Sequence, residues 1–278
     1  MSATAAAVRY RVEAGFVFPD ETIALAKAEQ RRLHGHCDIP PERYGESCDV
    51  GLLARRPILA TTAASQACLP DFAPVHIVQR LRQHAPVALG ETLALGGRYV
   101  EIGEARRGLV TRSLWEYRRA DGAVVLTVEP DVMLVDPGKK AGTPGGGKRP
   151  AAAPEPEGGA WAELARKECT PETTCGYCLN TTNLIHTDPA TARRYGFRAP
   201  IIAGNQTVNF MLEALALDAQ PVSFDMEIRF RKPVFWDEGI DIEGCRDAEG
   251  RLTAIRAVND QGVTVADATV NAVCYGGW

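Results

Sequence analysis

Residues 180–204 read NTTNLIHTDPATARRYGFRAPIIAG and carry more structural information than any other part of the chain. Asp188 is a typical helix N-cap, Pro189 suits the first helical position, and Gly196 suits the left-handed residue that follows a helix. The pattern therefore predicts a short helix between Asp188 and Gly196. A second helix is expected to begin near Gly204, at the end of the segment.

The longer helix is predicted over residues 205–217. Its apolar residues follow i, i+3, i+4, i+7 spacing and form one stripe that would pack on a sheet: Val208, Met211, Leu212 and Leu215. Alternation of polar and apolar residues predicts strands in two groups. They lie at about 91–103, 108–118 and 123–135, and then at 222–231, 239–247, 251–258 and 262–274. A helix followed by consecutive antiparallel strands indicates an α+β fold.

The two halves of the chain resemble each other. The sequence PVALGETL at residues 86–93 and the sequence PVFWDEGI at residues 233–240 each lead into a series of strands. Asp121-Gly122 and Gln261-Gly262 stand at corresponding positions, where a tight hairpin needs a residue that tolerates positive φ. Such an internal repeat predicts two related structural units.

A stretch rich in proline and glycine separates the halves. Residues 136–159 read DPGKKAGTPGGGKRPAAAPEPEGG, with no large apolar side chain that could offset the entropy of ordering. We therefore predict an N-terminal unit over residues 1–135, an exposed linker over 136–159 and a C-terminal unit over 160–278.

The composition is that of an ordinary globular protein. The 278 residues are 45% hydrophobic and 24% charged, which excludes a disordered chain or a collagen-like fibre. The net charge of −4 gives no electrostatic reason to expect nucleic acid, and no apolar run approaches the roughly 20 residues of a membrane helix. No secretory signal is recognisable, and eight cysteines are too few for a disulfide scaffold. We expect a cytoplasmic protein without nucleic-acid or membrane partners.

Two residues of the 180–204 segment suggest chemistry. His186 is one of only five histidines and lies in a polar stretch before the capped helix. Gly204 stands at the start of the longer helix, where backbone N–H groups are unpaired and the helix dipole is positive. Together they would place a proton-transfer group beside a site that stabilises an oxyanion.

This segment resembles the hydratase motif of MaoC-like dehydratases, the (R)-specific enoyl-CoA hydratases. The family pattern is roughly Asp-x-Asn-Pro-Leu-His-x-Asp, then a helix, then Gly-Phe-x-x-Pro-Ile-x-x-Gly. The matching residues are Asn183, His186, Asp188, Gly196, Phe197, Pro200, Ile201 and Gly204. The following EIRFRKPVF at 227–235 is similar to the next strand and turn of the family. The resemblance covers the second half well, and the first half only as a series of strands. It implies a double hotdog, in which each of two fused units is an antiparallel sheet wrapping a long helix.

The resemblance also implies an activity. Family members add water reversibly to a 2-enoyl thioester and form a 3-hydroxyacyl thioester, a lyase reaction of fatty acid metabolism. By this resemblance His186 is the general acid/base and the Gly204 N–H polarises the thioester carbonyl. The substrate is carried by CoA or an acyl carrier protein, and no metal or other cofactor is implied. The fused pair could suffice as a monomer or form a homodimer.

One position departs from the family pattern. Five residues before His186, where the family has its catalytic Asp, this chain has Thr181, whose hydroxyl is no base near neutral pH. Either His186 works alone while Thr181 and Asn183 position the water, or a carboxylate from elsewhere substitutes, or the protein binds acyl thioesters without hydrating them. Thioester hydrolysis is an alternative reaction, because hotdog folds also host thioesterases.

The first half contains a weaker version of the same pattern. His36-Cys37-Asp38 loosely resembles the region around His186, and Thr61 is expected where the second half has Gly204. We therefore expect the first unit to shape the acyl pocket without catalysing the reaction. Cys175 and Cys178 form a lone Cys-x-x-Cys pair, which is too few ligands for a metal site and favours a packing role.

Overall fold

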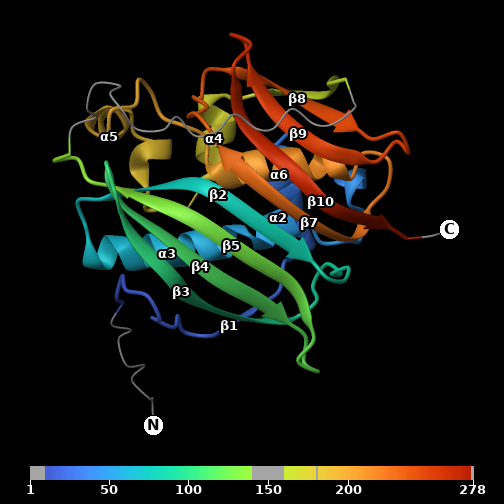
Figure 1. The fold of residues 1–278 in the computed structure, drawn as a ribbon, viewed down its shortest axis with the longest axis horizontal. Helices are drawn as coiled ribbons and strands as arrows, with labels where there is room; N and C mark the ends of the chain where they lie inside the picture. Colours follow the sequence, from blue (N-terminus) through green and yellow to red (C-terminus); the bar gives the residue numbers. More distant parts are fainter. Residues whose placement is uncertain (1–9, 140–159, 180, 277–278) are drawn as a thin grey trace.

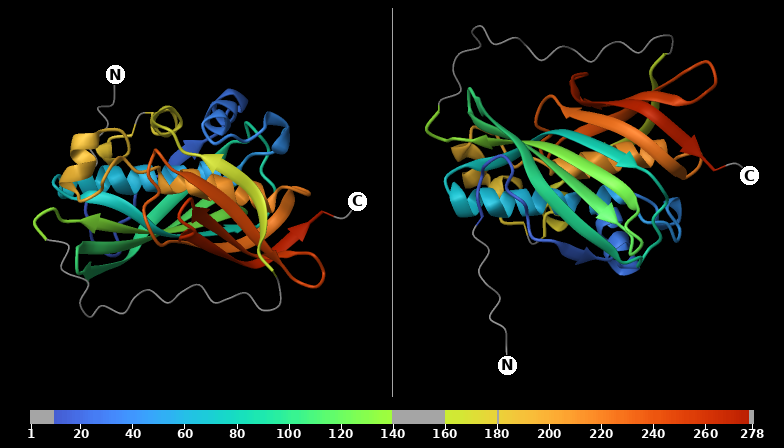
Figure 2. Two further views of the ribbon diagram at one scale, coloured as in Figure 1. Left: turned by 90° about the horizontal axis from the view of Figure 1, so that it is seen from above. Right: turned by 60° about the horizontal axis from the view of Figure 1, so that its bottom comes forward.

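The computed structural model describes residues 10–139, 160–179 and 181–276. Its strands form one continuous antiparallel sheet of ten strands (Figure 1). The helices gather on one face of this sheet (Figure 2). Most of the predicted linker, residues 140–159, lies outside the described residues. Within the described residues, no helix combines the length and apolar content needed to cross a lipid bilayer.

The first group of elements occupies residues 21–135. In chain order these elements are β1 (Glu21–Ile23), α1 (Lys27–Gly35), η1 (Pro41–Arg43), α2 (Val50–Leu53), α3 (Arg55–Cys68), β2 (Ala73–Gln83), β3 (Leu93–Ala105), β4 (Gly108–Arg118) and β5 (Val124–Val135).

The second group occupies residues 162–275. It consists of β6 (Ala162–Glu168), α4 (Pro171–Tyr177), η2 (Leu184–His186), α5 (Pro189–Arg194), α6 (Gly204–Leu215), β7 (Pro221–Phe230), β8 (Gly239–Arg246), β9 (Leu252–Asn259) and β10 (Thr264–Tyr275).

The two groups have the same strand arrangement. The sheet order is β1-β3-β4-β5-β2 in the first unit and, read from the opposite edge, β6-β8-β9-β10-β7 in the second. The units meet where β2 pairs with β7, with Val78 opposite Arg229 and Gln83 opposite Phe224. Pairing the two edge strands removes one exposed edge from each unit.

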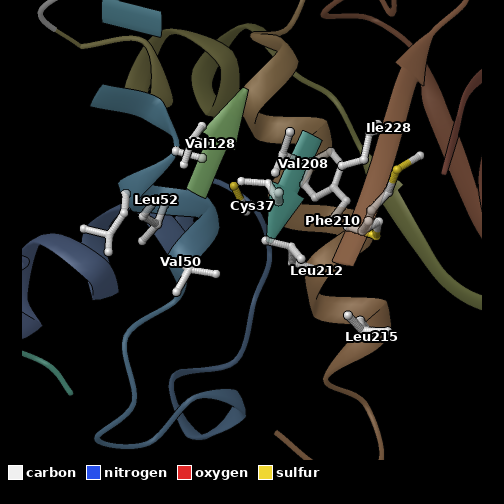
Figure 3. Packing of buried hydrophobic residues seen from close by; sticks show 14 of the residues in the cluster. Cys37, Val50, Leu52, Val128, Val208, Phe210, Leu212, Leu215 and Ile228 are labelled. Carbon is white, nitrogen blue, oxygen red and sulfur yellow. The ribbon is translucent and has the colours of Figure 1, made fainter. Parts of the chain in front are cut away.

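A long helix packs against each half of the sheet. All residues of α6 from Asn205 to Leu215 are buried, so this helix has no solvent face within that range. Val208, Phe210 and Leu212 of α6 lie among side chains from β7 and from α2 (Figure 3). The apolar stripe predicted the bounds of this helix within two residues at each end, but not that its polar face is buried as well.

The short helix and the tight turns follow the local sequence signals. The Asp188 carboxylate accepts hydrogen bonds from the Ala190 and Thr191 N–H groups at the start of α5, and Gly196 after it has φ +84°. Gly122 and Gly262 have φ values of +87° and +70°. The seven predicted strands are β3, β4, β5, β7, β8, β9 and β10, each within about three residues of its predicted bounds.

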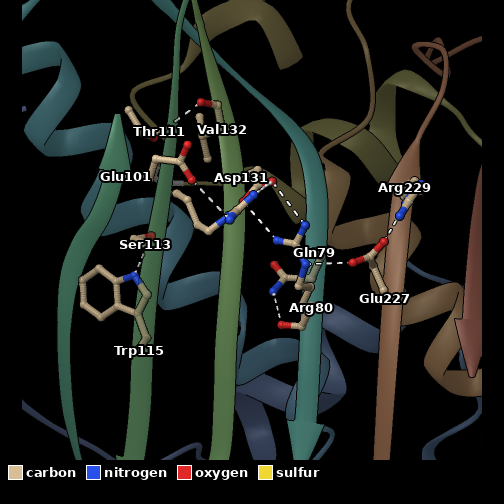
Figure 4. Close-up of polar contacts among 11 residues, drawn as sticks. Gln79, Arg80, Glu101, Thr111, Ser113, Trp115, Asp131, Val132, Glu227 and Arg229 are labelled. Atoms are coloured by element: carbon tan, nitrogen blue, oxygen red, sulfur yellow. Dashed lines mark hydrogen bonds and ion pairs between the residues drawn. The ribbon is translucent and has the colours of Figure 1, made fainter. Parts of the chain in front are cut away.

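The central strand β2 was not predicted, because its polar residues conceal its position. Gln79 is fully buried, and Arg80 beside it bonds to Asp131 of β5 at 3.0 Å and to Glu227 of β7 at 2.8 Å (Figure 4). Arg112 of β4 also bonds to Asp131, at 3.0 Å. These ion pairs cross four strands and both units, so the partners that permit a polar central strand lie far away in the sequence.

The expected position of Thr61 is wrong. The long helix of the first unit begins with α2 and continues as α3, so Thr61 lies well inside it and its hydroxyl donates to the Pro57 carbonyl oxygen at 2.9 Å. A helix-interior threonine offers no free backbone N–H to a ligand. Thr61 is therefore not the structural counterpart of Gly204.

Candidate functional site

A pocket of about 240 Å³ lies between the start of α6, the η2 turn and strand β2. Both units contribute to its lining. The four residues singled out from the sequence, Thr181, Asn183, His186 and Gly204, all line it. Residues separated by up to 23 positions in the chain are thus brought to one cavity.

Hydrogen bonds hold the His186 ring in one orientation. Its Nδ1–H donates to the Ile201 carbonyl oxygen at 2.9 Å. A carbonyl oxygen can only accept, so Nδ1 carries the proton and Nε2 keeps its lone pair. The Asn183 Nδ2 lies 3.4 Å from Nε2 and also donates to the Pro74 carbonyl oxygen at 2.8 Å. These contacts leave Nε2 as the basic atom of the ring.

The surroundings keep His186 neutral. Burial lowers the pKa of His186 from 6.5 to about 4, the bond to the Ile201 carbonyl opposes this shift, and the positive charge of Arg55 adds to it. Arg55 is itself held by bonds to the Tyr177 and Leu179 carbonyl oxygens at 3.1 and 3.3 Å. At neutral pH, His186 is therefore a proton acceptor that forms a strongly acidic imidazolium after accepting a proton.

Thr181 supplies a hydroxyl where a base was expected by resemblance. Its Oγ1 accepts a hydrogen bond from the Asn183 N–H at 3.2 Å. No Asp or Glu lies among the described residues that line the pocket, so a substitute carboxylate finds no support. The charged lining residues are instead basic: Arg55, Arg107, Arg231 and Lys232.

Gly204 is the first residue of α6, and its N-cap Ala203 makes no side-chain capping bond. The space beside its Cα is occupied, because an added Cβ would lie 2.7 Å from Nδ1 of His76 and 2.9 Å from the His76 Cβ. Glycine is therefore required here by the imidazole of His76.

His76 is a pocket residue that sequence reasoning missed. It comes from β2 of the first unit, and its ring lies 4.6 Å from the ring of Phe230 on β7. Neither ring nitrogen makes a hydrogen bond of ordinary geometry, and both are shielded from solvent. Burial lowers the pKa of His76 to about 4, while the Val78 backbone, the Asp131 charge and the Gln79 side chain oppose the shift. The only sequence signal for His76 is that the chain has just five histidines.

The first unit has a position equivalent to the start of α6. Ser47 forms a bridge with Ala88 just before α2, as Ile201 does with Phe235 just before α6. The next residue donates in both units, from the Cys48 N–H to Val87 and from the Ile202 N–H to Val234, both at 2.9 Å. The following residues then correspond: Asp49 with Ala203 and Val50 with Gly204.

At this equivalent position a carboxylate of the chain occupies the helix start. Asp49 is fully buried and accepts bonds from the Gly51 N–H at 2.9 Å, the His34 Nε2–H at 2.9 Å and the Asn209 Nδ2–H at 2.8 Å. A second cavity lies beside this helix start and is lined by Ser47, Cys48, Asp49 and Val50, among others. His36, the residue suggested by the repeat, packs its ring against Gly176 and lines neither cavity.

The cysteine pair belongs to the surroundings of the pocket. Cys175 and Cys178 are both free thiols, and Cys178 lines the pocket. Burial raises the pKa of the Cys178 thiol to about 12, so it stays protonated at neutral pH. No group of three or more His, Cys, Asp or Glu side chains in the described part of the chain is arranged to hold a metal ion.

Several solved structures have the same fold as this chain, and one of them is described as a double hotdog. A MaoC-like dehydratase superposes with a TM-score of 0.73 at 12% identity, covering 95% of this chain and 99% of the other. HtdX from Mycobacterium tuberculosis gives 0.68 at 20% identity, covering 91% and 98%. Rv0216 from the same organism, described as a double hotdog, gives 0.62 at 17% identity, covering 93% and 96%. No family model and no curated sequence matches the chain.

These comparisons confirm the predicted fold class, an α+β double hotdog. They also confirm at the level of the fold that the chain resembles MaoC-like dehydratases.

Proposed function

We propose that this protein catalyses the reversible hydration of a 2-enoyl-CoA thioester to a 3-hydroxyacyl-CoA. One observation carries the proposal. The neutral His186, with Nε2 as its basic atom, shares a pocket with the start of α6 at Gly204. A base and a helix N-terminus in one cavity are the two elements that addition of water to an unsaturated thioester requires.

In the proposed reaction the thioester carbonyl oxygen accepts a hydrogen bond from the Gly204 N–H. A water molecule attacks C3 while His186 Nε2 takes one of its protons, and the C2–C3 double-bond electrons move to form an enolate. The imidazolium then delivers the proton to C2 and returns to its neutral form. The balance is one water added across one double bond, and the reverse sequence is dehydration.

The missing carboxylate shapes this mechanism. With Thr181 in place of the family Asp, a single imidazole performs both proton transfers, while Thr181 and Asn183 orient the water. The low pKa of His186 makes it a weak base but makes its imidazolium a strong acid toward C2. The positive end of the α6 dipole and the basic residues that line the pocket stabilise the negative charge of the enolate.

The first unit, residues 1–135, contributes walls of the pocket in this proposal. Ile58, Leu59 and Thr62 of α3 line it, next to residues of the second unit, 160–278. Lys232 is exposed and Arg107 half-buried at the same pocket, and their charges suit the phosphates of CoA or of an acyl carrier protein. A homodimer remains a prediction.

The test is a hydration assay with crotonyl-CoA and with longer and branched enoyl-CoAs. The reaction is monitored by the loss of enoyl absorbance. His186→Gln should lower kcat by roughly 10²–10⁴. His84→Gln is the matched control, because this exposed histidine follows β2 and bonds to Thr127 outside the pocket. Wild-type turnover by His186→Gln would refute the assignment. Thiol release without loss of the enoyl group would indicate a thioesterase, and tight binding without turnover a binding protein.

A further inference from the structure

We propose that His76 is a catalytic residue whose imidazole donates a hydrogen bond to the thioester carbonyl oxygen held at the Gly204 N–H. The inference rests on the proposed function and deepens it. It gives the first unit a direct part in the reaction, in place of the pocket-forming role expected from the sequence.

The first support is the position of the ring. Nδ1 of His76 lies 2.7 Å from the point where a Cβ of Gly204 would stand. Standard bond lengths then place Nδ1 within about 5 Å of the Gly204 nitrogen. An oxygen atom about 2.9 Å from each of two such nitrogens fits between them with ordinary hydrogen-bond lengths. This upper limit allows a single oxygen atom to contact both nitrogens.

The contacts around β2 hold the ring in place. Phe230 packs against one side of it, with ring centroids 4.6 Å apart. Two residues earlier, the Pro74 carbonyl oxygen accepts a bond from Asn183, which also approaches His186 Nε2. The same stretch of β2 thus carries His76 and anchors the turn that carries His186, so the two rings are positioned by one element.

The second support comes from buried polar groups that lack hydrogen-bond partners. Both ring nitrogens of His76 are shielded from solvent and lack a hydrogen bond of ordinary geometry, and the nearby polar groups are the Val78 backbone and the Gln79 side chain, which raise its pKa. Asn205, the next residue of α6, is 2% exposed, and both polar atoms of its side chain also lack partners. Buried polar groups almost always have partners, because leaving one unpaired costs free energy. Several unpaired groups around one helix start, all lining one pocket, indicate the binding place of a polar ligand atom.

The third support is electrostatic. Burial holds His76 in its neutral form, with a pKa of about 4, and the positive end of α6 acts in the same direction. A neutral imidazole still donates one N–H, and a histidine kept neutral at a helix N-terminus is a known way to polarise a carbonyl group. A donor already oriented in a site with little water contributes typically 10²–10³ in kcat.

His76 also distinguishes this pocket from its counterpart. Strand pairing makes Phe224 of β7 the counterpart of His76, because β2 has one extra residue between His76 and Val78. Phe224 lines the second pocket and has no side-chain donor. At the other helix start the carboxylate of Asp49 is already bound. Only one of the two equivalent positions therefore combines a free helix start with an imidazole donor.

The test compares His76→Phe, which keeps an aromatic ring without a donor, with His76→Gln, which keeps a donor. His84→Gln, directly after the end of β2, serves as the control. In steady-state hydration, His76→Phe should lose roughly 10²–10³ in kcat with little change in KM, and His76→Gln should recover part of the loss. Thermal unfolding checks that the variants fold, and His76→Leu replaces His76→Phe if the latter does not.

A second measurement reports on the carbonyl itself. Crotonyl-CoA labelled with ¹³C at the thioester carbonyl is bound to the His186→Gln protein, which slows turnover, and the carbonyl stretch is recorded by infrared difference spectroscopy. We expect a shift to lower frequency on binding, and a smaller shift when His76→Phe is added. An unchanged shift in the double variant would overturn the role of His76 while leaving hydration by His186 intact. If the wild-type protein neither binds nor hydrates any enoyl thioester, the proposed function fails and this inference with it.

Discussion

Acidification tests the electrostatic picture of the pocket most directly. His76 and His186 both have pKa values of about 4 in the folded protein, against an ordinary value of 6.5. Below pH 6.5 the unfolded chain therefore binds two protons that the folded protein does not yet bind. Linkage then requires that stability is full above pH 6.5, falls as the pH decreases, and reaches its lower limit near pH 4.

The size of the effect follows from the two shifts. A difference of about 2.5 pKa units at 1.36 kcal/mol per unit corresponds to about 3 kcal/mol for each histidine. Together the two shifts, about five pKa units in all, should lower the free energy of unfolding by about 7 kcal/mol as the pH falls from above 6.5 to below 4. That is a large part of the 5–15 kcal/mol that stabilises a typical domain. Catalysis should behave differently, because a base with a pKa of about 4 stays active while the protein remains folded.

Urea unfolding at pH 7, 5.5 and 4.5 measures the first effect, and the pH profile of kcat/KM measures the second. We expect kcat/KM to stay level from pH 7 to about pH 5. His76→Gln and His186→Gln should each remove about half of the pH dependence of stability, and His84→Gln should leave it unchanged. An acid limb of kcat/KM between pH 6 and 7 in a folded protein would show that His186 is solvated, and the reasoning would be wrong.

Three further substitutions test close contacts inside the protein. Gly204→Ala forces a Cβ against His76 and should lower the free energy of unfolding by about 1–3 kcal/mol, as measured by urea unfolding. It should also remove most of the hydration activity in steady-state kinetics. Full activity would contradict the close contact between His76 and Gly204. Asp49→Ala leaves three buried donors without their acceptor and should cost about 3–5 kcal/mol in urea unfolding, while the folded fraction keeps its turnover. Gly97→Ala on β3 would place a Cβ 2.2 Å from the buried indole of β4 and should lower the unfolding midpoint, whereas Gly103→Ala on the same strand meets nothing within 4 Å and should not.

Features coded by neighbouring residues could be predicted from the sequence. The Asp188 cap, the positive-φ glycines at 122, 196 and 262, and the apolar stripe of α6 depend on residues within one or two turns of each other. The same holds for the seven predicted strands, whose alternation follows from one buried face. Gly204 was placed correctly at the start of its helix for this reason.

Features that join distant parts of the chain could not be predicted. Nothing near Gly204 in the sequence indicates that His76, 128 positions earlier, fills the space beside its Cα. Similarly, the polar residues of β2 argue against a central strand until Arg80 is seen between Asp131 and Glu227. The error at Thr61 arose because sequence similarity aligned a helix interior with a helix start, and only backbone pairing identifies Val50 as the true counterpart.

The occupation of one helix start by Asp49 has a consequence for how such a protein can evolve. In a symmetric dimer of identical subunits every mutation appears twice, so a carboxylate that fills one helix start would fill both and abolish binding altogether. Joining both copies in a single gene product removes that constraint. One copy can then hold its own buried carboxylate at the helix start, while the other leaves the start at Gly204 free for the proposed substrate.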